Sequence, residues 1–201
     1  MAAAVLANLG QQYDRVTVDG AMSFRRFLSL PNRDIEDEIG VYPSVYYSEH
    51  VRHASNSKAK LAALDVFSWD QARAINKIIS TELENKGKNS NVGLLRWVGN
   101  QNVYWGRKLG KHRAHTIEMT NIGVWKAKPH EERGDWKVGR MVFSQDCAGS
   151  DPAFACSIAT GGDGCLTLSC EWKENATEDL PMEKVLKDAR ECLNALVDGK
   201  K

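Results

Sequence analysis

Residues 154–172 read FACSIATGGDGCLTLSCEW, and this stretch decides the fold. Its apolar residues alternate with small or polar ones on both sides of a glycine-rich centre: Phe154, Cys156 and Ile158, then Leu166, Leu168, Cys170 and Trp172. Alternation with a period of two is typical of strands that bury one face. The glycines at 161–164 precede a strand and not a helix, which favours a hairpin turn over a phosphate-binding loop. The stretch therefore predicts a β-hairpin with one face in the core.

Other segments also have extended character. β-branched residues favour a strand within 15–28, and Pro43 places the start of a strand at 41–51 at a sheet edge or an irregular position. Residues 136–143 are strand-like, whereas the polar, acidic stretch 31–40 predicts a loop. The run HTIEMTNIGVW at 115–125 ends abruptly in Thr120 and Asn121, which either make a turn or face a reacting group.

Helical periodicity occupies the middle and the end of the chain. A capping box at 68–71 precedes apolar residues three or four apart, which predicts an amphipathic helix ending near Gly87: Ala72, Ile75, Ile79 and Leu83. A second helix, starting at 89–91 and forming a hairpin with the first, is expected to carry an apolar face of Leu94, Trp97, Val98, Tyr104 and Trp105. Asp179 and Pro181 mark a last helix with the buried stripe Met182, Val185, Leu186, Ala189, Leu193 and Leu196. The opening MAAAVLANL is also helical in character.

This order of elements predicts an α/β fold in which a mixed sheet packs with helices, rather than a regular βαβ array. At 201 residues the chain fits a single domain, 1–201. No apolar run approaches the ~20 residues needed to span a bilayer, and the opening has no signal-peptide character, so a cytoplasmic location is expected. In that compartment the five cysteines are expected to be thiols: Cys147, Cys156, Cys165, Cys170 and Cys192.

The balance of basic and acidic residues does not indicate a macromolecular partner. With 27 basic and 26 acidic residues the net charge is +1, which disfavours nucleic acid. The basic run at 107–113 is either a solvated helix end or a contact for an anionic cofactor. The histidine pairs His50 with His53 and His112 with His115 lack a third ligand, so no metal site is expected, and none of the five histidines has an Asp four positions later.

Short motifs occur in order over nearly the whole chain: R-R-F-L at 25–28, I-G-x-Y at 39–42, T-N-I-G-V at 120–124, F-S-Q at 143–145 and L-x-x-x-W at 168–172. Together they resemble the C-terminal half of fungal alcohol O-acetyltransferases. These enzymes belong to the CoA-dependent acyltransferase superfamily, with chloramphenicol acetyltransferase and the condensation domains of peptide synthetases. The resemblance implies that 1–201 is a single lobe of that fold.

The resemblance also implies an activity. Such enzymes have two lobes with a tunnel between them, which acetyl-CoA and a small-molecule alcohol enter from opposite ends. Their base is the histidine of an H-x-x-x-D motif in the first lobe, and this sequence contains no such motif. The chain is therefore expected to be an acetyltransferase component, in specialised metabolism, that is inactive or incomplete alone. Alternatives are a non-catalytic remnant that binds another protein, or a half completed by a separately encoded lobe or by a second copy.

The resemblance places four residues at the tunnel wall. Thr120 and Asn121 are expected to orient the thioester or to donate a hydrogen bond to the developing oxyanion, although Asn121 with Gly123 can equally make a turn. Ser144 and Gln145 are weaker candidates for the same cavity. Arg25 and Arg26 are expected to pair with acidic side chains, and the basic run at 107–113 is a possible contact for CoA phosphates.

Overall fold

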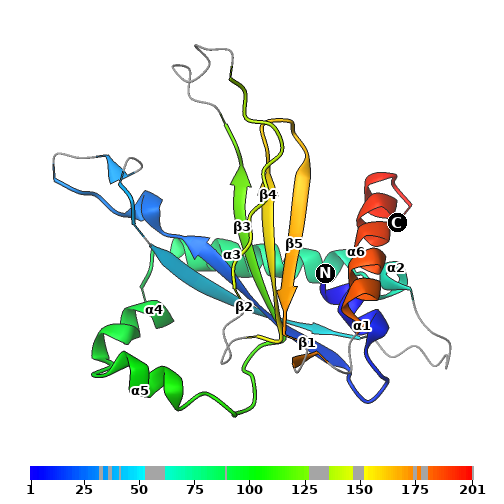
Figure 1. Ribbon diagram of the computed structural model, residues 1–201, viewed down its shortest axis with the longest axis horizontal. Coiled ribbons are helices and arrows are strands. Elements are labelled where there is room, and N and C mark those ends of the chain that lie inside the picture. Colours follow the sequence, from blue (N-terminus) through cyan, green and yellow to red (C-terminus); the bar gives the residue numbers. More distant parts are fainter. Residues whose placement is uncertain are drawn as a thin grey trace.

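The computed structural model describes residues 1–31, 34–35, 38–40, 42–52, 62–88, 90–126, 136–146, 152–173, 176–177 and 181–200. His53, His130, Cys147 and Asp179, which figured in the sequence predictions, lie outside these residues. The described residues form a five-stranded sheet in the order β2-β1-β3-β4-β5 (Figure 1). The strands are β1 (Arg15–Ser23), β2 (Pro43–Val51), β3 (Ile117–Val124), β4 (Phe154–Thr160) and β5 (Leu166–Trp172).

The sheet is mixed. β1 pairs antiparallel with β2 and parallel with β3, and β4 pairs parallel with β3 and antiparallel with β5. The β4–β5 hairpin is the one that the alternating pattern predicted, and its turn closes with the Gly164 amide donating to the Gly161 carbonyl at 3.1 Å. Gly164 has φ +73°, a conformation that glycine adopts without steric cost. β2 lies at an edge of the sheet, as Pro43 predicted.

One face of the sheet carries the core. Val16, Ile117 and Phe154 project from β1, β3 and β4 and are fully buried against α1 (Ala2–Asn8) and α6 (Met182–Val197), with α2 (Ala63–Val66) beside them. Burying each such side chain contributes about 1.5–3 kcal/mol. The α/β class with a mixed sheet packed by helices is therefore confirmed.

The buried stripe predicted for the last helix is confirmed in part: Met182, Val185 and Ala189 are buried, Leu186 and Leu196 are half-buried, and Leu193 is exposed. The buried residues of α6 are Met182, Val185, Ala189 and Cys192, whereas Leu193 is 46% exposed. The steps of three, four and three residues keep one side of the helix against the sheet. Cys192 continues that series, and its neighbour Leu193 is rotated by about 100° away from it.

α3 (Trp69–Glu84) begins where the capping box predicted. The Ser68 side chain accepts a hydrogen bond from the Gln71 amide at 3.4 Å, and the Gln71 side chain donates to the Val51 carbonyl at 2.9 Å. The second bond ties the first turn of α3 to the end of β2. In Figure 1, α3 runs behind the sheet.

The prediction of one long second helix, paired with α3 as a hairpin, was wrong. The segment breaks into α4 (Asn91–Leu94), a 3-10 turn η3 (Leu95–Trp97) and α5 (Gln101–Gly106). Gly99 is a poor helix former, and Asn100 restarts the helix because its side chain accepts from the Val103 amide at 3.1 Å. α4 contacts β2, and α4 and α5 lie to one side of the sheet, separate from α3 (Figure 1).

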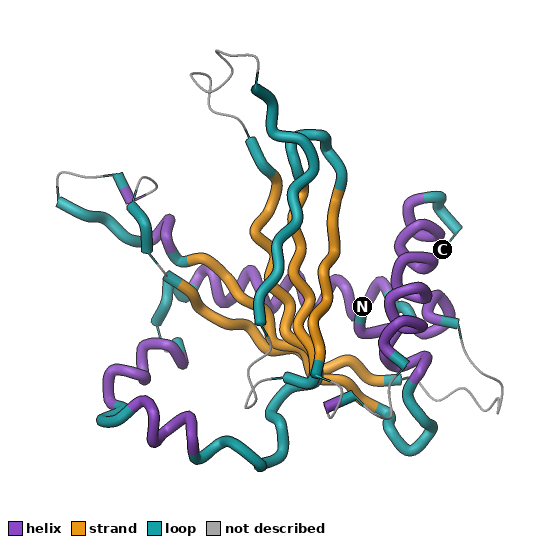
Figure 2. The backbone as a smooth tube through the Cα atoms, in the orientation of Figure 1, coloured by secondary structure: helices purple, strands orange, loops and turns teal. Residues whose placement is uncertain are grey.

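Residues 136–143 were predicted as a strand, and this was also wrong. The described residues 136–146 form no strand and instead run along the sheet as a strap (Figure 2). The strap is held by separate bonds: the Gly162 amide donates to the Gly139 carbonyl at 3.0 Å, and the Thr167 hydroxyl to the Met141 carbonyl at 2.6 Å. A strand requires a continuous ladder, which these isolated contacts do not make.

Among the helices of the described residues, none combines the length and the apolar character needed to cross a membrane.

Candidate hydroxyl site on the open face

The strand register places the polar residues of β3 on the face of the sheet opposite the core. Ile117 and Met119 belong to the core cluster, so Glu118 and Thr120, which alternate with them, project to the other side, here called the open face. Thr120 is in register with Ser157 of the neighbouring parallel strand β4. Residues in register on paired strands project to the same side, so the two hydroxyl side chains are neighbours on the open face.

Both hydroxyls are buried without a hydrogen bond. Thr120 Oγ1 and Ser157 Oγ are inaccessible to solvent, and neither has a partner within the described residues. Ser157 as a whole is only 1% exposed. A buried polar atom without a partner costs about 1–3 kcal/mol, and such atoms are uncommon in native structures. These two residues are here called the hydroxyl pair, and they are unsatisfied polar groups beneath the surface of this face of the sheet.

Ser157 was not predicted from the sequence. It was counted among the small residues that alternate with Phe154, Cys156 and Ile158, and the spacing of the chain gave no sign of its neighbour. Thr120 and Ser157 are separated by a connection that includes the strap, and only the pairing of β3 with β4 brings them together.

Asn121 closes a local Asx-turn inside β3. Its side-chain oxygen accepts a hydrogen bond from the Gly123 amide at 2.8 Å, and Gly123 has φ +86°. The β3–β4 register shifts between Asn121 and Val124, so the strand is irregular here. Asn121 is exposed and adjoins Thr120, but its side-chain oxygen serves the backbone.

The strap brings Gln145 to the open face. Its side-chain amide donates to Glu118 Oε1 at 2.6 Å, two residues along β3 from Thr120. Ser144, next to it, is exposed. Of the four residues expected at the site, Thr120 lies on the open face of β3, and Gln145 of the strap contacts the same strand at Glu118. Asn121 follows Thr120 within β3, and Ser144 is exposed on the strap.

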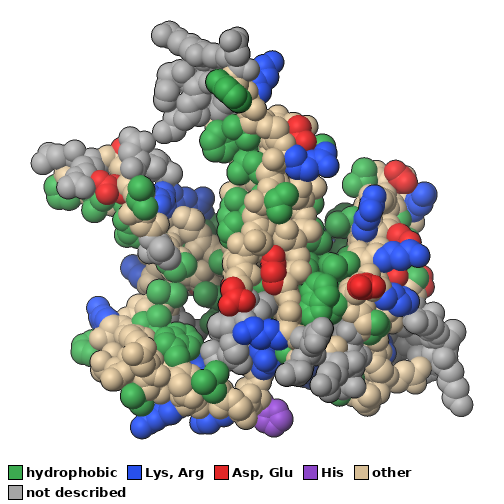
Figure 3. Space-filling view, viewed as in Figure 1, with side chains coloured by type: hydrophobic (Ala, Val, Ile, Leu, Met, Phe, Trp, Pro, Cys, Tyr) green, Lys and Arg blue, Asp and Glu red, His purple; other side chains and the backbone are tan. Residues whose placement is uncertain are grey.

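Exposed apolar side chains surround this region. Together they form the apolar rim: Ile122, Val124, Trp125, Trp136, Val138 and Val142, from the end of β3 and from the strap. Trp136 is 92% exposed and Val142 71%. Figure 3 shows hydrophobic side chains gathered over this end of the strands. Contiguous apolar surface of this kind is typical of an interface or a ligand groove.

No histidine among the described residues lies beside the hydroxyl pair. His50 projects from β2 to the core side, where burial lowers its pKa although a hydrogen bond with Gln71 opposes this effect. His115 stacks on Tyr47 with ring centroids 4.7 Å apart, and burial together with the charge of Lys108 lowers its pKa. In the described part of the chain, no three His, Cys, Asp or Glu side chains are placed to hold a metal ion.

Acidic side chains also lie on the open face, and they take part in interactions of their own. Asp19 and Glu118 are in register on β1 and β3, one row from the hydroxyl pair, and both take part in further interactions. Glu171 lies on β5, where burial raises the pKa of its carboxyl group.

The four described cysteines, Cys156, Cys165, Cys170 and Cys192, are free thiols, as expected.

Arg25 holds a loop and does not reach the site. Its guanidinium donates to the carbonyl oxygens of Ile35, of Glu38 at 2.6 Å and of Gly40 at 3.1 Å, and it lies over the ring of Tyr42. Among the described residues, the contacts of Arg25 are thus with backbone carbonyls and with an aromatic ring. Arg26 lies over the ring of Phe27.

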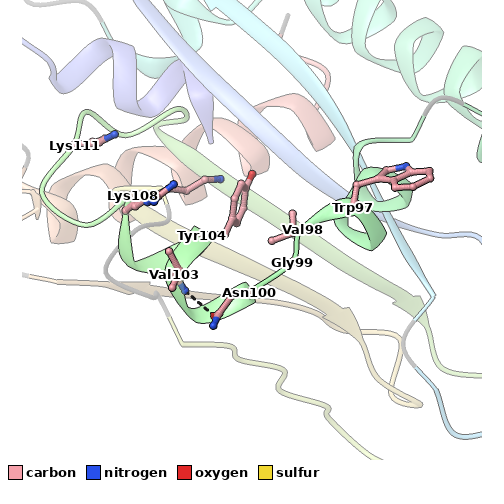
Figure 4. Close-up of a pocket in the computed structure, with 9 residues that line it drawn as sticks. Trp97, Val98, Gly99, Asn100, Val103, Tyr104, Lys108 and Lys111 are labelled. Carbon is pink, nitrogen blue, oxygen red and sulfur yellow. Dashed lines mark hydrogen bonds between the residues drawn. The ribbon is translucent and has the colours of Figure 1, made fainter.

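The basic run at 107–113 borders a separate cavity of about 560 Å³ (Figure 4). The run begins directly after α5 ends at Gly106, so its cations lie at the carbonyl end of that helix. The cavity is lined by Trp97, Val98, Gly99, Asn100, Val103, Tyr104, Arg107, Lys108 and Lys111. This arrangement fits a solvated helix end and leaves the contact with an anionic ligand open.

Comparison with known proteins gives one relative by sequence. The chain is 26% identical over 189 residues to "Probable alcohol acetyltransferase crmB" of Aspergillus fumigatus, a match that covers 92% of this chain and 40% of that protein. The chain therefore spans well under half the length of this relative. No family model matches the sequence.

Among solved structures, the epimerization domain from the third module of tyrocidine synthetase B matches with a TM-score of 0.38 and 14% identity, over 99% of this chain and 42% of that one. The sequence match to crmB confirms the resemblance that the motifs implied: the chain is similar to part of an alcohol acetyltransferase.

Proposed function

We propose that the chain is one lobe of an alcohol O-acetyltransferase and forms one wall of the site in which an acetyl group passes from acetyl-CoA to an alcohol. The observation that carries the proposal is the hydroxyl pair, two buried hydroxyls without partners on the open face, beside an exposed apolar rim. The similarity to a probable alcohol acetyltransferase supplies the reaction class. We infer that the completed enzyme acts in the cytoplasm, in specialised metabolism.

The chemistry assigns a role to the hydroxyl pair. In acyl transfer the alcohol oxygen attacks the thioester carbonyl carbon, its proton passes to a base, and the C–S bond breaks to release the CoA thiol. Negative charge develops on the carbonyl oxygen in between. Two preorganised hydroxyl donors stabilise this charge, and removing one such donor costs about 10²–10³ in rate. Thr120 and Ser157 are the residues that we assign as these donors.

The base comes from elsewhere. Among the described residues, the histidines are remote from the hydroxyl pair, and Asp19 and Glu118 are already engaged. General-base catalysis typically contributes 10²–10⁴-fold. We therefore infer that the chain requires a second lobe, which supplies the base and covers the apolar rim. An obligate interface of this kind buries on the order of 2,000 Å² or more.

The experiment combines the purified chain with a separately expressed lobe that carries an H-x-x-x-D motif, such as the resemblance implies for the first half of an alcohol O-acetyltransferase. Release of the CoA thiol from acetyl-CoA is followed with a panel of alcohols. The chain alone is expected to be inactive, and the mixture active. Thr120→Val and Ser157→Ala should each lower the rate by about 10²–10³-fold.

The matched control is Thr81→Val, which removes an exposed hydroxyl from α3, on the other side of the sheet from the hydroxyl pair. It should leave the rate close to that of the wild type. Turnover by the chain alone, or turnover of the mixture that Thr120→Val and Ser157→Ala leave unchanged, contradicts the proposal.

A second candidate is a non-catalytic partner that binds another protein through the apolar rim. The exposed apolar rim favours it, because apolar surface of this kind is typical of protein interfaces. A stable complex with the H-x-x-x-D lobe that binds acetyl-CoA but shows no thiol release with any alcohol would support this candidate over the first.

A further inference from the structure

The cavity beside α5 lies in a segment with a charge distribution unlike that of the rest of the chain. Residues 85–117 contain seven basic residues and no Asp or Glu: Lys86, Lys88, Arg96, Arg107, Lys108, Lys111 and Arg113. The rest of the chain then holds 20 basic and 26 acidic residues. The near-neutral net charge therefore conceals a locally positive surface, which attracts anions. Figure 3 shows Lys and Arg side chains along α5 and the turn after it.

The same segment exposes aromatic rings. Trp97 is 74% exposed, Tyr104 37% and Trp105 40%. In Figure 4, Tyr104 and Trp97 stand on opposite sides of Val98, and Lys108 lies beside the Tyr104 ring. The cavity thus combines an apolar floor, two aromatic walls and a basic rim.

The positive charges at the edge of the cavity face no acidic side chain among the residues that line it. Arg107, Lys108 and Lys111 all line the cavity, so three basic side chains share its edge. No carboxylate lines the cavity. The Lys108 ammonium is held over the rings of Tyr104 and Trp105, at 4.8 and 4.4 Å from their centroids. Such a contact orders a lysine side chain that would otherwise be mobile in solvent.

We propose that this cavity binds a nucleotide phosphate, with its planar base against Trp97 or Tyr104 and its phosphates at Arg107, Lys108 and Lys111. Aromatic rings stack on bases, and cations at the rim of an apolar cavity bind phosphate. A volume of about 560 Å³ is within the range of small-molecule sites. The inference rests on the proposed function in one respect: the nucleotide is then the phosphorylated adenosine end of acetyl-CoA.

The experiment titrates the purified chain with adenosine 3′,5′-bisphosphate by isothermal titration calorimetry. Inorganic phosphate and adenosine form two further arms. Saturable binding of the bisphosphate is expected, with weaker binding of phosphate and of adenosine, because each carries only half of the recognised chemistry. Affinity should fall as salt is raised.

Lys108→Gln with Lys111→Gln should weaken binding of the bisphosphate roughly tenfold or more, since charge-assisted hydrogen bonds are lost. Trp97→Ala should weaken it as well, and this side chain is exposed enough for its removal to leave folding intact. The matched control is Lys187→Gln on α6, an exposed lysine paired with Glu191 and remote from the cavity, which should bind as the wild type does.

Three results would overturn the inference: no saturable binding of the bisphosphate, equal affinity for phosphate alone, or binding unchanged by the double lysine variant. Binding of a single-stranded oligonucleotide in preference to the bisphosphate would also overturn it. The assay needs no second lobe and no turnover. Loss of this site with acyl transfer intact would refute the cavity alone, whereas binding without acyl transfer in the completed enzyme would refute the proposed function alone.

Discussion

The hydroxyl pair makes an unusual prediction, that removing a polar group stabilises the protein. Thr120→Val is nearly isosteric and replaces a buried hydroxyl that has no partner in the described residues. An unsatisfied buried polar group costs about 1–3 kcal/mol, so the variant should gain about 1–2 kcal/mol of unfolding free energy. Ser157→Ala should gain slightly less, because it leaves a small void in a site that is 1% exposed.

The matched control is Thr167→Val on the same face of the sheet. Its hydroxyl donates to the Met141 carbonyl at 2.6 Å, with the Ala159 carbonyl at 3.2 Å. Losing this bond should cost about 1 kcal/mol. The two threonine variants should therefore shift stability in opposite directions.

Urea unfolding at fixed pH, followed by circular dichroism, measures the effect. In a domain of this size, 1 kcal/mol corresponds to a Tm change of about 2–4 °C, so a scan gives a second measurement. If Thr120→Val loses as much stability as Thr167→Val, the Thr120 hydroxyl is satisfied in the free protein. The hydroxyl pair would then lose its assignment as a vacant binding feature.

Three further predictions concern the fold that supports the site. Phe154→Ala removes a fully buried ring from the core and should cost about 3–5 kcal/mol in urea unfolding, and an unchanged midpoint would contradict the packing described. Gly162→Ala places a Cβ 2.1 Å from the Val138 carbonyl oxygen, so the strap must move, and hydrogen exchange of the residue 162 amide should speed up while Gly164→Asn, in open space at φ +73°, leaves it protected. Burial lowers the pKa of His50 below its ordinary value of about 6.5, so the unfolded chain binds more protons than the folded one as pH falls below neutrality. Stability should then fall between about pH 7 and pH 5, and His50→Gln should flatten this dependence; equal slopes for both proteins would show that His50 does not cause it.

The periodic spacing of apolar residues and the helix-capping residues predicted the parts of the fold that local chemistry controls. The β4–β5 hairpin, the start of α3 at Ser68 and the edge position of Pro43 agree with the structure. Each depends on residues close together in sequence. The prediction of the second helix was wrong because its aromatic-rich run has the pattern of a buried helix face. In the described structure the run is interrupted at Gly99 and remains exposed.

The sequence by itself determined the α/β class, the main hairpin and the similarity to alcohol acetyltransferases. It predicted that a strand ends at Thr120, whereas β3 continues to Val124. It left open whether Asn121 makes a turn, and it gave Ser157 no role beyond that of a small residue between apolar ones. Only the tertiary structure decided these points. A site shared by two parallel strands brings together residues that are far apart in sequence, and no repeating pattern in the sequence links such residues. The register of β3 with β4 sets Thr120 beside Ser157, and the turn at Gly123 takes up the Asn121 side-chain oxygen.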